Sequence, residues 1–264
     1  EKKARDGVVG VLTGFNHLDE DAPMEKGTLT TLAARSGIGK SSFALSIARN
    51  AAEYGQRVLF ISIEMSVLRL MDRLVSIITA TPLSDIRKAK ADESLIDVKV
   101  SVERLRNKLN MVFIPNATSG QICRLVTREH RKNPIDLVIV DYLQLMCDPR
   151  GKNITDDIRI GNMTRALKIL AGKLNNAVLL LSQVNRQATM EDNGMPKLHH
   201  LRGSGNIEQD SDVVLILNRR NKDDISGEQM IAKNRNGASQ LSIPVLISPR
   251  TTEKKERVIT QIQQ

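Results

Sequence analysis

The chain has almost no aromatic side chains, since its 264 residues include four Phe, two Tyr and no Trp. Most of these stand within apolar runs, which excludes a binding surface built from exposed aromatic rings. No apolar run approaches the roughly 18 residues that a membrane-spanning helix needs, and the N-terminus carries no signal-peptide pattern. We therefore expect a protein without a membrane span.

Cysteine is equally scarce. Cys123 and Cys147 stand far apart without a C-x-x-C pattern, which excludes a disulfide framework and a cysteine-rich zinc site. We expect two buried or half-buried, reduced thiols, as in a cytoplasmic protein. The pair His199-His200 has no further ligand spaced to join it, so the sequence favours a polar loop over a metal site there.

Acidic residues are outnumbered, with 30 Asp and Glu against 39 Lys and Arg and a net charge of +9. This excess favours a polyanionic partner, and a basic protein without such a partner is the alternative. With so few aromatic rings, a nucleic acid would be held through its phosphates rather than by base stacking. Such binding would show little sequence preference and a steep dependence on salt.

The order of apolar segments predicts a single α/β domain with a mostly parallel central sheet flanked by helices and a terminal antiparallel hairpin. Strands are predicted at Leu29–Ala33, Val58–Ile63, Val112–Pro115, Leu137–Tyr142, Ala177–Ser182, Val213–Leu217, Gln229–Lys233 and Leu241–Ile247. Helices are predicted at Lys40–Tyr54, Ser66–Thr79, Glu93–Leu109, Ser119–Arg131 and Asp156–Leu174. Stretches 148–155, 186–205 and 218–227 are expected to be irregular and exposed.

The most informative segment present is a glycine loop between the first predicted strand and the first predicted helix. Its residues are Arg35, Ser36, Gly37, Ile38, Gly39, Lys40, Ser41 and Ser42. Glycines let backbone N–H groups turn inward around an anion, and the helix N-terminus adds partial positive charge. In such a loop Lys40 neutralises the terminal phosphates and the Ser41 hydroxyl holds Mg²⁺. An ordinary glycine-rich turn is the alternative, but it leaves Lys40 without a role.

Polar side chains follow three of the aliphatic strands. Asp141 stands where a Mg²⁺-binding acid belongs, Glu64 where a carboxylate can polarise an attacking water, and Gln183 where an amide can sense a γ-phosphate. Because the carboxyl ends of parallel strands meet at one edge of a sheet, we expect the three to converge. The simpler alternatives are a surface Asp, an acidic residue at a helix start and a polar strand end.

Lys233 and Arg235 alternate along the strand that enters the tip Asn234-Arg235-Asn236-Gly237, so their side chains point to the same face. Two interpretations stay open. The pair could be a charged edge that blocks strand addition. It could also be a lysine and an arginine finger presented to the ATP of another subunit.

Together these segments resemble the C-terminal ATPase domain of DnaB-family replicative DNA helicases, a RecA-like P-loop NTPase. The resemblance runs from Thr13 to about Pro249 and rests on six blocks in the family's order. The most characteristic are Asp141-Tyr142-Leu143-Gln144-Leu145-Met146 and Ile207-Glu208-Gln209-Asp210-Ser211-Asp212. Ala34, where a strict phosphate loop has Gly, matches the family's own habit. The resemblance implies a motor that hydrolyses ATP with Mg²⁺ and moves 5′→3′ on single-stranded DNA as a homohexamer.

The resemblance also assigns roles to single residues. It implies that Glu64 is the catalytic glutamate, that Asp141 binds Mg²⁺ and that Gln183 senses the γ-phosphate, with Lys233 and Arg235 acting on the neighbouring subunit's ATP. The residues that would hold DNA phosphates are Arg202, Gly203, Ser204 and Gly205. Two positions depart from the family: Gly203 stands where an acidic residue is usual, and His200 replaces a common Asp.

Residues 1–264 are expected to form one motor domain, with a linker remnant at 1–12, a flexible tail at 251–264 and no N-terminal collar. The chain begins with Glu1 rather than Met, as a fragment would. Primase and a helicase loader are the partners expected for the full-length protein, in the cytoplasm of a bacterium whether the source is bacterial, phage or plasmid.

Two other hypotheses compete with this one. A RadA-type branch-migration ATPase would carry an N-terminal zinc motif and an appended protease-like domain, and neither is found in this sequence. A nucleotide-binding assembly module without unwinding would not need Lys40, Glu64, Gln183 and Arg235 together.

Overall fold

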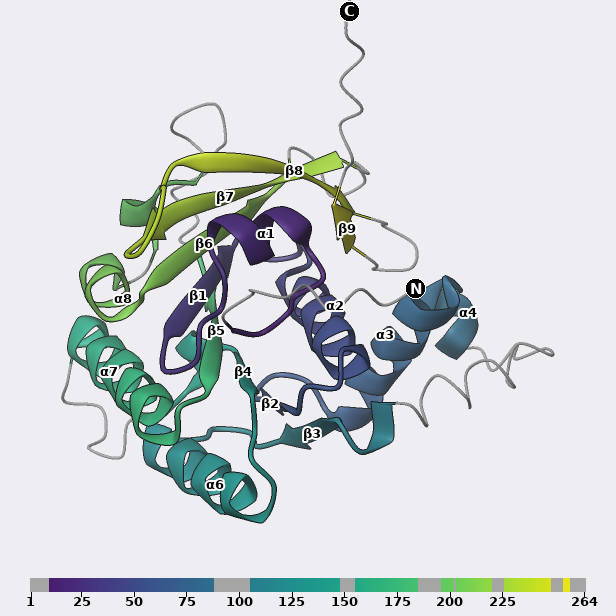
Figure 1. Ribbon diagram of the computed structural model, residues 1–264, viewed down its shortest axis with the longest axis horizontal. Helices are drawn as coiled ribbons and strands as arrows, with labels where there is room; N and C mark the ends of the chain where they lie inside the picture. The colour runs from purple at the N-terminus through teal and green to yellow at the C-terminus, as the bar shows by residue number, and fades with distance from the viewer. Residues whose placement is uncertain are drawn as a thin grey trace, which may run out of the picture.

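The computed structural model describes residues 10–87, 105–147, 155–184, 196–201, 203–219, 226–247 and 254–256. A sheet of nine strands forms the centre, in the order β3-β2-β4-β5-β1-β6-β7-β8-β9 (Figure 1). The first six strands of this order pair in parallel, whereas β7, β8 and β9 are antiparallel. The strands are β1 Leu29–Ala34, β2 Val58–Ser62, β3 Leu109–Phe113, β4 Leu137–Asp141, β5 Ala177–Gln183, β6 Val213–Asn218, β7 Ser226–Asn234, β8 Leu241–Ile247 and β9 Lys254–Glu256. The predicted fold class is confirmed.

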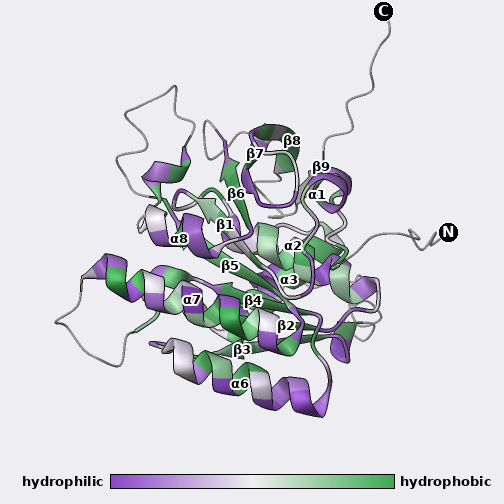
Figure 2. Cartoon of the chain, turned by 60° about the vertical axis from the view of Figure 1, so that its left-hand side comes forward, coloured by the Kyte–Doolittle hydropathy of each residue, from purple (hydrophilic) through white to green (hydrophobic). Residues whose placement is uncertain are grey.

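Helices cover both faces of the sheet (Figures 1 and 2). One apolar core joins the sheet to α2 and α3, and a second joins the opposite face to α6 and α7. The helices are α1 Asn16–Asp21, α2 Lys40–Glu53, α3 Val67–Thr79, α4 Leu83–Arg87, α6 Ser119–Lys132, α7 Asp156–Leu174 and α8 Ser204–Asp210, with short 3₁₀ turns at Leu143–Leu145 and Leu198–His200. None of the helices in these described ranges is both long and apolar enough to cross a membrane.

Continuous burial explains why the central strands were predictable. Every residue of β1, β2, β4 and β6 is buried, as expected for parallel strands covered on both faces. The edge strand β3 lies beside β2 alone, and none of its residues is fully buried. It begins at Leu109 rather than Val112, so the predicted helix Glu93–Leu109 was wrong at its end, and residues 93–104 lie outside the described residues. An edge strand buries only part of each face, so it leaves a weaker apolar pattern.

Several expected irregular segments contain regular structure. Within 186–205, the helix α8 begins at Ser204, and Asn218 and Ser226–Gly227 of the stretch 218–227 belong to β6 and β7. The structure also describes residues 196–201, Gly203 and Arg219 of these two stretches. Their other residues, and residues 148–154, lie outside the described residues. Within the expected tail, β9 pairs with β8. Cys147 is exposed, which corrects the expectation of a buried or half-buried thiol, whereas Cys123 is half-buried.

The short helix α8 packs closely on α7. A Cβ added to Gly161 would lie 2.7 Å from the Asn206 side chain, whose Nδ2 donates to the carbonyl of Asp157 at 2.9 Å. Gly203 precedes α8 with φ 72°, and a Cβ there would lie 2.8 Å from the side chain of Ile160, which is fully buried. The positive φ and this contact both favour glycine at position 203.

We predict that Gly203→Ala lowers the free energy of unfolding by about 1–2 kcal/mol from the left-handed backbone alone, with a further loss from the Ile160 contact. Urea denaturation of the purified domain measures this change in the free energy of unfolding. Gly205→Ala is the matched control, because a Cβ at Gly205 meets nothing within 4 Å. Alanine inside a helix is favoured over glycine, so the control should be neutral or stabilising. Equal losses in the two variants would contradict the prediction.

Candidate nucleotide and DNA site

The phosphate loop lies at the carboxyl end of β1, where the chain turns into α2. Gly37 and Gly39 have φ angles of 80° and 99°, in the left-handed region that favours glycine. No side chain among the described residues caps the start of α2 at Gly39. The first N–H groups of this helix are therefore left for another acceptor, and a phosphate is the ligand that commonly takes this place.

Arg35 braces the loop against the end of the neighbouring strand β6. Its guanidinium donates to Oδ1 of Asn218 at 2.9 Å and to the carbonyl of Arg219 at 3.0 Å. Arg219 donates in turn to the carbonyl of Gly37 at 3.4 Å. The Arg35 side chain thus holds the loop in shape, and no sequence pattern indicated that Asn218 and Arg219 take part.

Asp141 ends β4 beside the loop and is fully buried. Neither carboxylate oxygen has a hydrogen-bond partner of normal geometry among the described residues. Burial raises the pKa of Asp141, and the nearby Ser41 hydroxyl and the Lys40 charge act in the opposite direction. A buried carboxylate without a partner is costly unless a cation completes the site. Asp141 and Ser41 therefore fit Mg²⁺, which prefers oxygen ligands.

Lys40 is the first residue of α2, and its Nζ lies 4.8 Å from the centre of the Tyr142 ring. Burial lowers the pKa of Lys40, whereas the charges of Asp141 and Glu64 raise it. The ammonium group is thus largely withdrawn from water, over an aromatic face and close to two carboxylates. The contact with Tyr142 was not predicted from the sequence.

Glu64 follows β2 and is exposed, so its carboxylate is open to water. Arg73 of α3 brings a second cation to this edge. Burial lowers the pKa of Arg73, and the charges of Asp141 and Glu64 raise it. The Nε of Arg73 is buried and has no hydrogen-bond partner among the described residues. Arg73 was not predicted from the sequence, because a helical pattern does not tell which neighbour a single turn of the helix will face.

Gln183 ends β5 directly beside Ala34 of β1 in the parallel register. Its N–H donates to Oε1 of Gln144 at 3.0 Å, and Nε2 of Gln144 donates to the Ser182 hydroxyl at 2.9 Å. The Gln144 side chain therefore ties the end of β5 to the segment that follows β4. Gln144 lies in one of the characteristic sequence blocks, but its contacts were not predicted from the sequence.

The predicted groups therefore fall into two sets. The first set stands at the carboxyl ends of the neighbouring strands β2, β4, β5 and β1, and consists of Lys40, Ser41, Glu64, Asp141 and Gln183.

Lys233 and Arg235 lie at the other side of the sheet, near the amino ends of β1 and β6. Nη1 of Arg235 donates to Oδ1 of Asp212 at 3.2 Å, and Oδ2 of Asp212 accepts the N–H of Leu29, the first residue of β1, at 2.8 Å. At about 3.3 Å per residue, β1 separates this end from the phosphate loop by roughly 17 Å. Lys233 binds beside Arg235, since its Nζ donates to the carbonyl of Ser211 at 2.7 Å. Burial and the Arg235 charge lower the pKa of Lys233.

The loop expected to hold DNA is described in part. Arg202 lies outside the described residues, whereas Gly203, Ser204 and Gly205 enter α8 beside α7. His200 is buried, and its Nδ1 accepts the N–H of Lys197 at 3.0 Å. An Asp carboxylate could accept the same bond, which accounts for the departure at this position.

Metal-binding clusters of three or more His, Cys, Asp or Glu side chains are absent from the part of the chain that the structure describes. His199 and His200 contact each other edge to face, with ring centres 4.1 Å apart. Asp141 with Ser41 is therefore the candidate metal position that the geometry supports.

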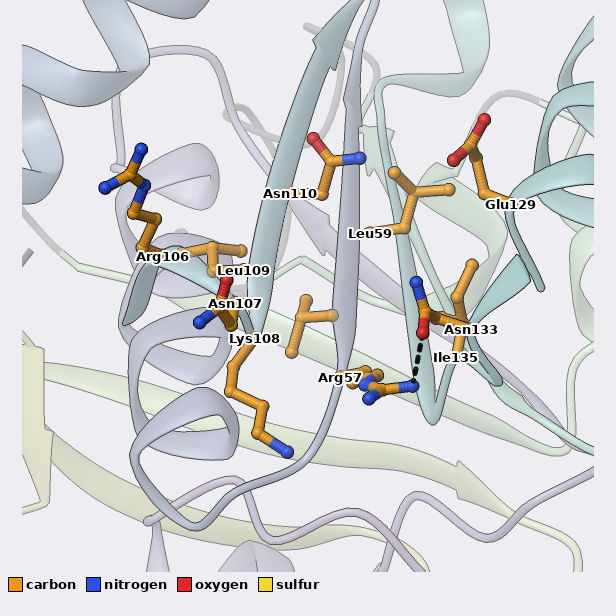
Figure 3. A pocket seen from close by; sticks show the side chains of 11 residues that line it. Arg57, Leu59, Arg106, Asn107, Lys108, Leu109, Asn110, Glu129, Asn133 and Ile135 are labelled. Carbon is orange, nitrogen blue, oxygen red and sulfur yellow. Dashed lines mark hydrogen bonds between the residues drawn. The ribbon is translucent and has the colours of Figure 1, made fainter. Parts of the chain in front are cut away.

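A separate pocket of about 530 Å³ opens at the amino ends of β2 and β3 (Figure 3). Three of its lining side chains are basic, namely Arg57, Arg106 and Lys108. Arg57 donates to Oδ1 of Asn133 at 3.2 Å, the bond drawn in Figure 3. Because the phosphate loop lies at the carboxyl edge, this pocket is not part of the nucleotide site.

Comparison of the sequence with known proteins identifies the family of this chain. The family model described as the DnaB-like helicase C terminal domain matches residues 10–253. A replicative DNA helicase DnaB of Leifsonia xyli is 36% identical over 253 residues, covering 90% of this chain and 54% of that protein. A probable plasmid replicative DNA helicase of Chlamydia muridarum is 31% identical over 252 residues, covering 92% and 54%. The chain thus spans about half the length of these relatives.

Solved structures lead to the same family. A DnaB-like replicative helicase, solved in a study of its interactions with primase, is 27% identical with a TM-score of 0.87, covering 95% of this chain and 62% of that one. A second solved structure, described as an ATPase domain, has the same identity and TM-score and covers 96% and 93%. These neighbours confirm the expected RecA-like helicase ATPase fold. By the match over nearly its whole length, this chain belongs to the DnaB-like helicase C-terminal domain family.

Proposed function

We propose that this chain is the ATP-driven motor domain of a replicative DNA helicase. The observation that carries the proposal is the division of charged groups between the two ends of β1. A phosphate loop with Lys40, Asp141 and Glu64 lies at one end, and Lys233 and Arg235 lie about 17 Å away at the other. By this proposal, fast hydrolysis of ATP needs both sets of groups, because an arginine finger accelerates phosphoryl transfer by several orders of magnitude.

Each group at the carboxyl edge has a role in this proposal. The N–H groups of residues 37–41 and the Lys40 ammonium hold the β- and γ-phosphates, and Asp141 and Ser41 hold Mg²⁺. Bound Mg²⁺ would neutralise charge on the β- and γ-oxygens. The exposed Glu64 carboxylate orients the attacking water and accepts hydrogen bonds from it. Gln183, held by Gln144, is placed to sense the γ-phosphate from β5.

The second half of each site comes from a neighbouring subunit. Lys233 and Arg235 would stabilise the charge that develops on the transferred phosphate, as an arginine finger does. The long separation within one subunit supports action between subunits, because neither side chain can span the length of β1. A closed ring, here a homohexamer, gives every subunit one neighbour on each side.

Single-stranded DNA is the proposed track, with movement in the 5′→3′ direction. Arg202, Gly203, Ser204 and Gly205 would contact its phosphates, in keeping with the net charge of +9 and the lack of Trp. Primase and a helicase loader are proposed partners of the full-length protein, and one solved relative is described with its interactions with primase.

A nucleotide-binding assembly module without unwinding is the main alternative. The buried Asp141 carboxylate, which has no hydrogen-bond partner among the described residues, and the solvent-open Glu64 argue against it. A scaffold needs neither a carboxylate suited to a cation nor a carboxylate placed for a water molecule.

We predict DNA-stimulated ATP hydrolysis and unwinding of a fork that carries a 5′ single-stranded tail. Glu64→Gln should abolish turnover, by about 100-fold or more, and should leave nucleotide binding nearly unchanged, because the amide keeps the shape but cannot take a proton. Steady-state ATPase assays and a fluorescent nucleotide titration measure the two effects. Glu53→Gln, at the exposed end of α2, is the matched control. Nucleotide binding without turnover in the unmodified protein would favour the assembly module.

A second prediction concerns the neighbouring subunit. Arg235→Ala rings and Glu64→Gln rings should each be inactive. A 1:1 mixture should recover up to about one quarter of wild-type hydrolysis, because half of the intact catalytic sites then receive an intact finger. The measurement is ATPase activity after joint refolding or exchange of subunits. If mixing restores nothing although mixed rings form, Arg235 does not act between subunits.

A further inference from the structure

Asp212 is a nearly buried carboxylate that the proposed chemistry does not use. It stands just before β6 and is 6% exposed. Its Oδ2 accepts the Leu29 N–H at 2.8 Å and the Nζ of Lys168, on α7, at 2.6 Å. Its own N–H donates to the carbonyl of Leu29 at 2.8 Å. The carboxylate is thereby fixed to the first residue of β1 and to α7.

Arg235 is held to this fixed point by both its main chain and its side chain. The Arg235 N–H donates to the carbonyl of Asp212 at 2.9 Å, and Nη1 donates to Oδ1 at 3.2 Å. Nη2 donates to the carbonyl of Gln209 at 3.1 Å. About half of the side chain stays exposed, so the guanidinium is oriented without being enclosed. Two hydrogen bonds from one planar guanidinium to two separate acceptors fix its orientation, which suits it to aiming the side chain.

The neighbouring contacts keep the hairpin tip in place. Nζ of Lys233 donates to the carbonyls of Glu208 and Ser211. Nδ2 of Asn234 donates to the carbonyl of Asp21, at the end of α1, at 2.8 Å. Arg235 therefore projects from a tip that is anchored on both sides.

We propose that Asp212 is the positioning residue of Arg235, and that it joins the arginine of one subunit rigidly to the base of that subunit's β1. The inference rests on the proposed action of Arg235 on a neighbour's ATP. Lys168 pairs with the same carboxylate and balances part of its charge. Because β1 carries the phosphate loop at its other end, Asp212 fixes the position of Arg235 relative to the strand that leads to that loop.

The test is Asp212→Asn, measured as DNA-stimulated ATP hydrolysis with separate kcat and KM. We expect kcat to fall about 10- to 100-fold through misplacement of Arg235. KM for ATP should change less than about threefold, because the nucleotide-binding loop lies at the far end of β1. Asp210→Asn is the matched control, since Asp210 accepts from Thr164 and pairs with Arg165 instead of Arg235. Its kcat should stay within about twofold of wild type.

Mixed rings separate positioning from general damage. Asp212→Asn subunits mixed with Glu64→Gln subunits should regain hydrolysis, because the latter supply a well-placed Arg235 to intact catalytic sites. The double variant Asp212→Asn/Arg235→Ala should be no less active than Arg235→Ala alone, the non-additivity expected of residues that act together. If Asp212→Asn fails to fold, Asp212→Glu keeps the charge and displaces the carboxylate, and it should give the same loss and the same rescue.

Two outcomes would overturn the inference while leaving the proposed function intact. One is that Arg235→Ala rings are inactive whereas Asp212→Asn rings keep the wild-type kcat. The other is an inactive Asp212→Asn ring that mixing with Glu64→Gln does not rescue. Wild-type activity of the Arg235→Ala ring would instead overturn the proposed action between subunits.

Discussion

The pairing of β1 with β5 on one side and β6 on the other is the constraint on which the rest of the structure depends. All six residues of β1 are buried, so the strand cannot move without disturbing both apolar cores. Its carboxyl end carries the phosphate loop, and its amino end is bonded to Asp212. One rigid strand thus sets the distance and direction between the phosphate loop and the two cations Lys233 and Arg235.

Charge at the carboxyl edge is balanced only in part. Asp141 is buried without a hydrogen-bond partner among the described residues, and Lys40 and Arg73 supply positive charge near it. Burial acts against the charged form of each of these groups, which raises the pKa of Asp141 and lowers those of the two cations. Such an arrangement is costly to an isolated subunit and is suited to a charged ligand that completes it.

The helix α8 links the second half of the site to the loop proposed to hold DNA. It begins at Ser204, directly after Gly203, and packs on α7 through the contact of Asn206 with Gly161. It ends near the carbonyls that accept hydrogen bonds from Lys233 and Arg235. Its seven residues span only about 10 Å. Residues 203–205 of the proposed DNA loop therefore belong to one small packed unit with Lys233 and Arg235.

Regularities of long segments made much of the fold predictable. Continuous aliphatic runs marked the central strands, and the bounds of α7 agree with its 3.6-residue apolar stripe. The edge strand β3 was predicted only in part, as Val112–Pro115, because its residues are not continuously buried. The short helices α1, α4 and α8 were not predicted, because segments of five to seven residues are too short to show a helical period. The family was predicted from short sequence motifs, which can be identified without knowing how distant segments pack.

The sequence by itself determined the family and the residue types of the site, because the glycine loop and the polar residues after aliphatic strands are local patterns. Only the tertiary structure decided the partners of these residues. Arg73 facing Asp141, Gln144 binding the end of β5, and Asp212 joining Arg235 to β1 all connect segments far apart in the chain. Such contacts depend on how helices and strands pack, and a single sequence does not reveal which side chains that packing brings together.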